Sequence, residues 1–362
     1  MTSLKGMSLF SGMGGDTLGM EQSGVKVVAF SEKERVFCET HKINFEDCKL
    51  IGEKVKSDIL NVDDDEFLHY NNEIDILFAG FPCQSFSTGG KRKVEDPRNT
   101  LFREFVRAAK LTNAKIIIGE NVKGLLTKKT ETGELYIDII VEEFKKLDYS
   151  VKYKLFQCHK YGIPQKRERL LIIGIKNSYL DNYNLEFPEE DTPDKDSWTN
   201  IKDIVSFSME GTMKIDKKVF DFEQIPKECI ITDLKNKEKE TGGHPYLLMK
   251  RGIANKSYGD KSYDTLFSFG KRCSPIHCEV VDIRNPSKTI ICTYEHQPRF
   301  FVPIRNKSGD YLRMFTPDEL KQIQGFPKDY KLSGNQKQQI IQIGNAVPPM
   351  LIKKIVDKIL NK

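Results

Sequence analysis

The chain has 362 residues, of which 38% are hydrophobic and 30% are charged, and its formal net charge is +5. This length suits one large domain plus a smaller one, and the small positive charge permits a polyanionic partner without demanding one. No stretch approaches the roughly 20 apolar residues of a membrane span, and the amino-terminal MTSLKGMSLF lacks the apolar core of a secretory signal. We therefore expect no membrane association and a cytoplasmic location.

The eight cysteines lack the spacing of a disulfide framework, which is typical of reduced thiols in a cytoplasm. Cys273, His277 and Cys278 lie close together, but no second ligand pair stands at a zinc-finger spacing. We therefore expect no metal site.

The first half of the chain alternates apolar runs with amphipathic stretches. The expected strands lie at 5–10, 25–31, 75–80, 114–120, 151–158 and 169–175, and the expected helices include 101–112 and 134–149. This βαβ alternation predicts an α/β fold with a doubly wound, mostly parallel, Rossmann-like sheet. We assign residues 1–178 to this domain.

The pattern changes near residue 178. Residues 179–285 are polar and weakly periodic, and we expect them to form a second, smaller domain. Residues 284–302 then read as a strand or hairpin, 316–326 as a helix with a capping box beginning at Thr316, and 345–360 as a proline-initiated helix. We assign residues 286–362 to a return to the first domain.

A glycine-rich turn follows the first expected strand. Gly12, Gly14 and Gly15 let the backbone approach a bound cofactor closely, although Thr17 stands where a nicotinamide fingerprint would place its third glycine. Glu32 closes the next strand, where a carboxylate can accept hydrogen bonds from ribose hydroxyls. A tight turn plus a surface acid is the alternative interpretation, but together these features favour an adenosine-type cofactor. Asp58 and Ile59 could add an acid and an apolar wall to the same pocket.

Cys83 and Glu120 each follow an apolar strand, so both are expected at the same edge of the sheet. The cysteine is either a nucleophile or a small buried filler, and the glutamate is either a proton donor or a solvated acid at a strand end. If residues 165–169 are extended, Arg167 and Arg169 share one face and offer guanidinium donors to a carbonyl or phosphate. An exposed basic strand end is the alternative for these arginines.

Six segments in chain order resemble the successive signature motifs of the cytosine-5 DNA methyltransferase family, in particular the bacterial modification enzymes: FSGMGG, the strand-end Glu32, PCQSFS, ENVKG, QKRERL and QIGNAVPP. The resemblance covers nearly the whole chain outside residues 180–285. It implies S-adenosyl-L-methionine as methyl donor, with S-adenosyl-L-homocysteine as product, and a large catalytic domain. It also implies that residues 179–285 are the target-recognition domain and that the terminal helix packs beside the first strand.

The resemblance further implies which residues line the cofactor pocket. Lys33 is counted with them, although many relatives carry Trp or Ile after the ribose-binding acid. The expected set, with the three glycines of the turn, is Phe10, Gly12, Met13, Gly14, Gly15, Glu32, Lys33, Asp58, Ile59, Pro82, Leu101, Asn345 and Ala346.

For the chemistry, our hypothesis is that Cys83 adds to carbon 6 of a cytosine flipped out of duplex DNA, which activates carbon 5 for methylation. Glu120 then protonates or hydrogen-bonds N3, and Arg169 donates to O2 with support from Arg167. The expected enzyme is a DNA (cytosine-5)-methyltransferase of a restriction-modification system. We expect it to act as a monomer on a short specific duplex sequence, alongside a cognate restriction endonuclease.

Three other readings remain open. A transfer-RNA methyltransferase of the same fold would keep the thiolate chemistry, but the insert of about a hundred residues favours duplex DNA. A catalytically inactive DNA-binding homologue is disfavoured by the intact Cys83, Glu120 and Arg169. A nicotinamide-dependent oxidoreductase is disfavoured by Thr17.

Overall fold

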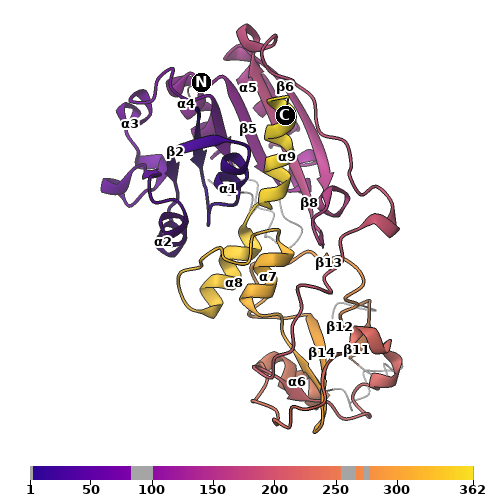
Figure 1. Ribbon diagram of the computed structural model, residues 1–362. Helices are drawn as coiled ribbons and strands as arrows, with labels where there is room; N and C mark the ends of the chain where they lie inside the picture. Colours follow the sequence, from indigo (N-terminus) through magenta and orange to yellow (C-terminus); the bar gives the residue numbers. More distant parts are fainter. Residues whose placement is uncertain (1–2, 83–100, 254–265, 273–276, 362) are drawn as a thin grey trace.

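The computed structural model describes residues 3–82, 101–253, 266–272 and 277–361. In this part of the chain, seven strands form one sheet in the order β3-β2-β1-β4-β5-β8-β6. Their bounds are β1 Leu4–Leu9, β2 Val25–Ser31, β3 Lys49–Leu50, β4 Ile76–Ala79, β5 Ile116–Asn121, β6 Tyr149–Gln157 and β8 Glu168–Lys176. This sheet and the helices on its faces form the large lobe (Figure 1).

The sheet is parallel from β3 to β5, whereas β8 pairs antiparallel with both β5 and β6. The expected α/β fold with a mostly parallel sheet is therefore confirmed. All six strands expected from the apolar runs are present. For the central strands β4 and β5 the reason is burial along their whole length, which requires near-continuous apolar sequence.

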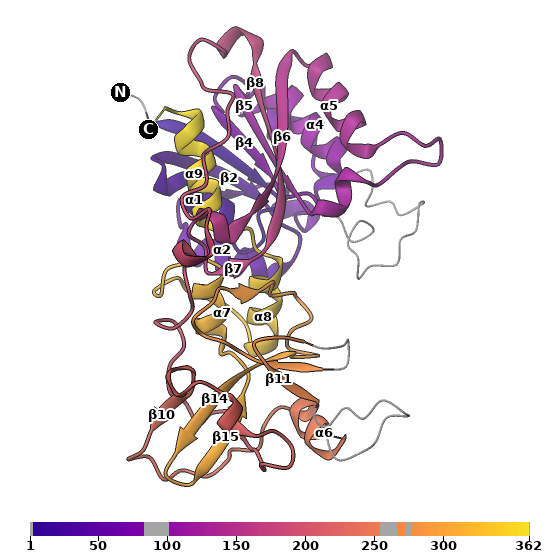
Figure 2. The ribbon, with the colours of Figure 1, turned by 90° about the vertical axis from the view of Figure 1, so that its right-hand side faces the viewer.

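Helices cover both faces of this sheet (Figure 2). Ile76 and Phe78 face one way, where their core cluster includes apolar residues of α1 and α9, and Leu77 and Ala79 face the other, where theirs includes residues of α3, α4 and α5. This alternation is the two-residue period of a strand. The helices are α1 Gly15–Gln22, α2 Arg35–Asn44, α3 Asp64–Leu68, α4 Phe102–Thr112, α5 Tyr136–Lys146 and α9 Pro349–Ile359.

The carboxyl-terminal helix α9 packs against α1, the helix that directly follows β1. A Cβ atom on Gly19 of α1 would lie 2.6 Å from the carbonyl oxygen of Pro349 and 2.7 Å from Cβ of Ile352. Only glycine permits this approach. The terminal helix and the first segment of the chain therefore meet in the large lobe, where α9 packs on the helix that follows the first strand.

A second sheet forms the small lobe. Six strands of the described chain join it, in the order β11-β12-β14-β15-β9 with β10 paired to β14. Their bounds are β9 Met213–Lys214, β10 Ile231–Asp233, β11 Phe267–Phe269, β12 Cys278–Val280, β14 Phe300–Asn306 and β15 Gly309–Arg313, and α6 spans Pro245–Ile253. Helices α7 Pro317–Ile323 and α8 Gln336–Asn345 lie between the two lobes (Figures 1 and 2).

The expected return to the first domain at residue 286 needs a correction. The short strand β13, Ser287–Lys288, does pair with β7, Gln165–Lys166, of the large-lobe segment. The chain then goes back, because β14 pairs with β12 and β10 of the small lobe and β15 pairs with β14. The small lobe therefore continues to Arg313. The apolar sequence of β14 would suit a strand of either sheet. Its pairing partners could therefore not be predicted from its composition.

Candidate active site

The strands β1, β2, β4 and β5 all end at one edge of the large sheet. The glycine turn follows β1, Glu32 follows β2, the segment 80–82 follows β4, and Glu120 lies near the end of β5. Because these strands are parallel, the four groups meet at their carboxyl ends, where open α/β sheets bind ligands. The expected site residues from these four segments therefore lie along one edge.

The turn after β1 has a constrained backbone. Phe10 has φ of 55°, Gly12 of 57° and Gly14 of 89°, and a positive φ is unusual for a bulky aromatic residue. The turn is closed by the amide of Gly14, which donates to the carbonyl oxygen of Ser11 at 2.9 Å. Backbone strain of this kind clusters at functional sites, which makes the turn a candidate ligand-binding segment.

The three glycines of the turn serve different purposes. A Cβ atom on Gly12 would meet nothing within 4 Å, whereas one on Gly14 would lie 2.7 Å from the ring of Phe45 and one on Gly15 would lie 2.1 Å from the carbonyl oxygen of Val347. Gly12 therefore faces open space. Gly14 and Gly15 allow close packing against the protein's own interior.

This difference predicts opposite outcomes for two alanine variants. Gly12→Ala should lower the free energy of unfolding by only about 1–2 kcal/mol, the usual strain of a left-handed alanine, while its methyl group enters the open space and weakens cofactor binding. Gly15→Ala should lose about 3 kcal/mol or more, because the terminal segment must move. Urea unfolding and calorimetric titration with S-adenosylmethionine measure the two effects. Equal stability losses would contradict the assignment.

Glu32 is tied to the glycine turn. Its carboxylate accepts hydrogen bonds from the backbone amides of Gly12 and Glu34, each at 2.8 Å. Burial raises the pKa of Glu32, and these amide hydrogen bonds act in the opposite direction. The acid is therefore held in a fixed orientation beside the open face of Gly12.

Lys33 and Asp58 form an ion pair at 2.6 Å, with 65% of the Lys33 side chain exposed. The carboxylate of Asp58 raises the pKa of Lys33, and Ile59 next to Asp58 is buried. Lys33 therefore places a cation beside Asp58, where an apolar wall of Trp or Ile was the expected alternative.

We expect Glu32→Ala to weaken S-adenosylmethionine binding about tenfold or more, as for the loss of hydrogen bonds to a charged group, and to leave DNA binding nearly unchanged. Glu34→Ala is the matched control, because the exposed Glu34 contributes only its backbone amide. Calorimetry with cofactor and with DNA separates the two affinities. An unchanged cofactor affinity in Glu32→Ala would remove this residue from the site.

The other expected pocket residues are less uniform. The side chain of Met13 is fully buried in the core, and its carbonyl accepts a hydrogen bond from the hydroxyl of Tyr330. Pro82 and Leu101 are half-buried, while Asn345 is exposed and Ala346 is buried. Met13 therefore contributes its side chain to the hydrophobic core and its carbonyl oxygen to a contact with Tyr330.

Glu120 and Arg169 form a buried ion pair. The Nε atom of Arg169 lies 2.5 Å from a carboxylate oxygen of Glu120, and their side chains are only 12% and 11% exposed. Burial raises the pKa of Glu120, and the adjacent Arg169 guanidinium partly offsets this rise. The antiparallel pairing of β5 with β8 sets the two strands side by side.

Two residues that the sequence reading left out shape this corner. A Cβ atom on Gly80 would lie 3.9 Å from a carboxylate oxygen of Glu120, so the backbone at the end of β4 lies beside the acid. The side-chain amide of Asn121 donates to the carbonyl oxygen of Phe81 at 3.3 Å, which ties the end of β5 to the segment after β4. The available signal was their position in the sequence: Gly80 lies just before the PCQSFS segment, and Asn121 lies within ENVKG.

Arg167 departs from the expectation that it shares a face with Arg169. Its guanidinium is 1% exposed and donates to the carbonyl oxygens of Ile290 at 2.9 Å, Gly344 at 3.0 Å and Ala346 at 3.1 Å. The reason is a tight turn, in which the amide of Arg167 donates to the carbonyl of Gln165 at 2.9 Å, so the segment is not continuously extended. Arg167 therefore holds the segment around Ala346 in place.

Cys83 lies outside the described residues, which resume at Leu101 after Pro82. The described segment Gly80–Pro82 leads directly to this cysteine from the side of Glu120. The possible metal ligand Cys273 also lies outside them. In the described part of the chain, no three His, Cys, Asp or Glu side chains gather closely enough to hold a metal ion.

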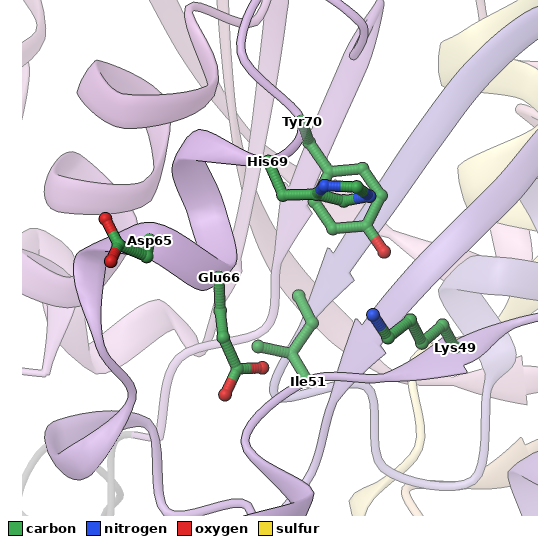
Figure 3. A pocket seen from close by; sticks show the side chains of 6 residues that line it. All are labelled: Lys49, Ile51, Asp65, Glu66, His69 and Tyr70. Carbon is green, nitrogen blue, oxygen red and sulfur yellow. The ribbon is translucent and has the colours of Figure 1, made fainter.

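A separate cavity of about 230 Å³ lies beside the edge strand β3 (Figure 3). None of the expected site residues lines it. Its walls combine the cationic Lys49 with two acids of α3 and two rings, and the full lining is Lys49, Ile51, Asp65, Glu66, His69 and Tyr70.

No described helix is long and apolar enough to cross a membrane.

A family model for the C-5 cytosine-specific DNA methylases matches residues 4–361. The chain belongs to this family. It is 30% identical to the Type II methyltransferase M1.HphI of Haemophilus parahaemolyticus, covering 99% of this chain and 87% of that protein. It is 32% identical to the Type II methyltransferase M.PspPI of a Psychrobacter species, and the match covers 98% of this chain and 79% of that protein.

Solved structures agree at the level of the fold. A mutant DNMT2 from Spodoptera frugiperda superimposes with a TM-score of 0.64 at 19% identity, covering 99% of this chain and all of that one. A putative DNA modification methyltransferase from an Escherichia coli prophage superimposes with a TM-score of 0.59 at 21% identity, and the match covers 99% of this chain and all of that one. The expected family, fold and enzyme class, a DNA (cytosine-5)-methyltransferase, are thereby confirmed.

Proposed function

We propose that this chain transfers a methyl group from S-adenosylmethionine to carbon 5 of a flipped cytosine in a short specific duplex sequence, through a covalent adduct with Cys83. The observation that carries the proposal is the buried Glu120–Arg169 pair, which lies beside the Gly80–Pro82 segment leading to that cysteine. A carboxyl group and a guanidinium at one corner match the N3 and O2 atoms of a cytosine.

The groups along the carboxyl edge of the sheet also suit S-adenosylmethionine as the cofactor. The open face of Gly12 offers room for close approach, the oriented carboxylate of Glu32 suits ribose hydroxyls, and Asp58 with its Lys33 partner suits a polar heterocycle edge. When bound, the cofactor supplies an electrophilic methyl group on a sulfonium. The protein's part is to hold it against the carboxyl edge of the sheet.

In the proposed chemistry, the thiolate of Cys83 adds to carbon 6 while Glu120 delivers a proton to N3, which leaves an electron-rich carbon 5. Arg169 donates to O2 and keeps the ring oriented. After methylation, a base removes the carbon 5 proton, the electron pair of that bond forms the carbon 5–carbon 6 double bond and expels the cysteine thiolate, and the carboxylate of Glu120 takes back the N3 proton. Flipping the base out of the duplex costs about a few kcal/mol.

For recognition, we assign residues 179–285, together with β14 and β15 of the same sheet, to reading the target sequence. The names of the curated relatives as Type II methyltransferases support a restriction-modification setting. In that setting a cognate endonuclease is the expected partner, and the enzyme works in the cytoplasm as a monomer on duplex DNA.

The test uses a suicide substrate. Sequencing DNA from expressing cells, after a conversion that spares 5-methylcytosine, gives the target, and an oligonucleotide with 5-fluorocytosine at that position is then offered with cofactor. Because fluorine cannot leave carbon 5 as a cation, the protein should stay attached through Cys83. A denaturing gel and mass spectrum of the trapped peptide identify the attachment point.

Cys83→Ser should lose this adduct and keep its cofactor affinity, because a serine hydroxyl ionises far less readily than a thiol. Turnover by Cys83→Ser at the wild-type rate, or a trapped peptide without Cys83, would overturn the mechanism. Methylation of transfer RNA in place of duplex DNA would instead favour the RNA-directed alternative.

A further inference from the structure

Asp16 lies beneath the glycine turn as a fully buried acid. It follows Gly15 in the first turn of α1 and is 1% exposed. The hydroxyl of Ser8 on β1 donates to one carboxylate oxygen, and the hydroxyl of Ser11 lies 3.4 Å from the other. A buried carboxylate is normally paired with a cation, and no salt bridge of Asp16 occurs among the described residues. This acid therefore needs an explanation.

The hydroxyls around Asp16 form one buried network. Ser11 Oγ lies 3.3 Å from the hydroxyl of Thr17, which lies 3.0 Å from Nε2 of His41. The His41 ring stacks on Phe30 with 3.7 Å between centroids. The network thus spans β1, α1, α2 and β2. Ser11 directly precedes Gly12, beside whose open face the cofactor is proposed to bind.

We propose that Asp16 is a positioning residue whose ionised form favours the cationic sulfonium of S-adenosylmethionine over the neutral thioether of S-adenosylhomocysteine. This inference rests on the proposed cofactor. The charge acts from the buried floor of the turn, where screening by water and salt is weak. A site that holds the reactive cation more tightly than the spent product avoids inhibition by that product.

The titration of Asp16 falls in the physiological range. Burial raises its pKa to about 7, against the opposing effect of the hydrogen bond from Ser8 and of the helix amides. The acid is therefore mostly neutral at pH 6 and mostly ionised at pH 8. Binding of a nearby cation favours the ionised form, so the preference for the sulfonium should increase as the pH rises through 7.

The groups that face Asp16 from other elements do not titrate in this interval. Burial lowers the pKa of His41 on α2 to about 3, and burial raises the pKa values of Cys48 and Tyr330 above their usual range. All three are therefore neutral from pH 6 to 8. Glu21, at the far end of α1, has a pKa raised by burial and serves as a control.

The experiment measures the ratio of the dissociation constants of S-adenosylhomocysteine and S-adenosylmethionine by calorimetry at pH 6, 7 and 8. Both ligands carry the same adenosine and carboxylate groups, but the sulfonium lowers the pKa of the amino group of S-adenosylmethionine. The ratio in the wild-type protein is therefore divided, at each pH, by the ratio in Asp16→Asn, which has the same shape without the charge and shows the ligand contribution alone. This quotient should rise about fivefold or more between pH 6 and pH 8, the lower end of ordinary coupling between sites.

Two further variants keep the test decisive if Asp16→Asn folds poorly. Ser11→Ala removes a hydroxyl that favours the ionised acid, so the midpoint of the rise should move to higher pH. Glu21→Gln should leave the rise unchanged. An equal pH dependence in the wild-type protein and in Asp16→Asn overturns the proposal and assigns any rise to the ligands or to another acid such as Glu32. Failure to bind either ligand would overturn the cofactor assignment itself, so the two failures are distinguishable.

Discussion

Glu120→Gln should lower kcat about 10²–10⁴-fold, the usual contribution of a positioned proton donor, and leave the dissociation constant of S-adenosylmethionine nearly unchanged. The amide keeps the shape of the side chain but cannot deliver a full proton to N3. Single-turnover methylation of duplex DNA with saturating cofactor measures the loss. The same assay with the 5-fluorocytosine substrate should show slower formation of the Cys83 adduct.

The pH profile supplies an independent readout of Glu120. Burial raises its pKa, so the carboxyl group holds its proton to higher pH than an exposed glutamate. The wild-type rate should fall as the pH rises through the folded-state pKa, because the ionised acid has no proton to give. Glu120→Gln should lack this alkaline decline.

A neighbouring acid provides the control for these measurements. Glu168 adjoins Arg169 in sequence, is half exposed and contacts Lys123 at 3.4 Å, away from the buried pair. Glu168→Gln should therefore change kcat by less than about twofold, since an exposed ion pair contributes little. Equal losses in the Glu120 and Glu168 variants would contradict the assignment of Glu120 as the proton donor.

The large lobe was predictable because its central strands β4 and β5 are buried along their whole length. In a chain with many charged residues, short apolar runs such as 75–80 and 114–120 indicate buried strands. The capping box predicted at Thr316 is also present, at the start of α7. The edge shared by the glycine turn, Glu32 and Glu120 follows from parallel pairing alone. Local sequence was sufficient for these features.

Contacts between distant segments were not predictable in the same way. Arg167 donates hydrogen bonds to the carbonyl oxygens of residues 290, 344 and 346. The sequence around Arg167 does not predict partners so far away in the chain. Asp16 reads in sequence as an ordinary acid in the first turn of a helix, and only the packing of α1 under the glycine turn shows that it is buried. The placement of β14 likewise depends on strand pairing and not on composition.

Arg313→Met should lower the free energy of unfolding by about 3–5 kcal/mol, because it leaves the carboxylate of Glu319 buried without its cation. The two side chains are 1% and 3% exposed, and the guanidinium makes two hydrogen bonds to Glu319 at 2.7 and 2.8 Å. Arg313 also donates to the carbonyl of Ser206, and Glu319 accepts from the amides of Ser206 and Thr316. The pair thus joins the end of β15, the start of α7 and the segment around Ser206.

The same hairpin contains the matched control. Arg305 and Asp310 pair at 2.5 Å on β14 and β15, but their side chains are 30% and 28% exposed, so Arg305→Met should lose only about 0–1 kcal/mol. Urea unfolding followed by circular dichroism compares the two variants. The double variant Arg313→Met with Glu319→Leu should recover part of the loss, because it removes both buried charges. Equal losses in Arg313→Met and Arg305→Met would show that the buried pair does not join these segments.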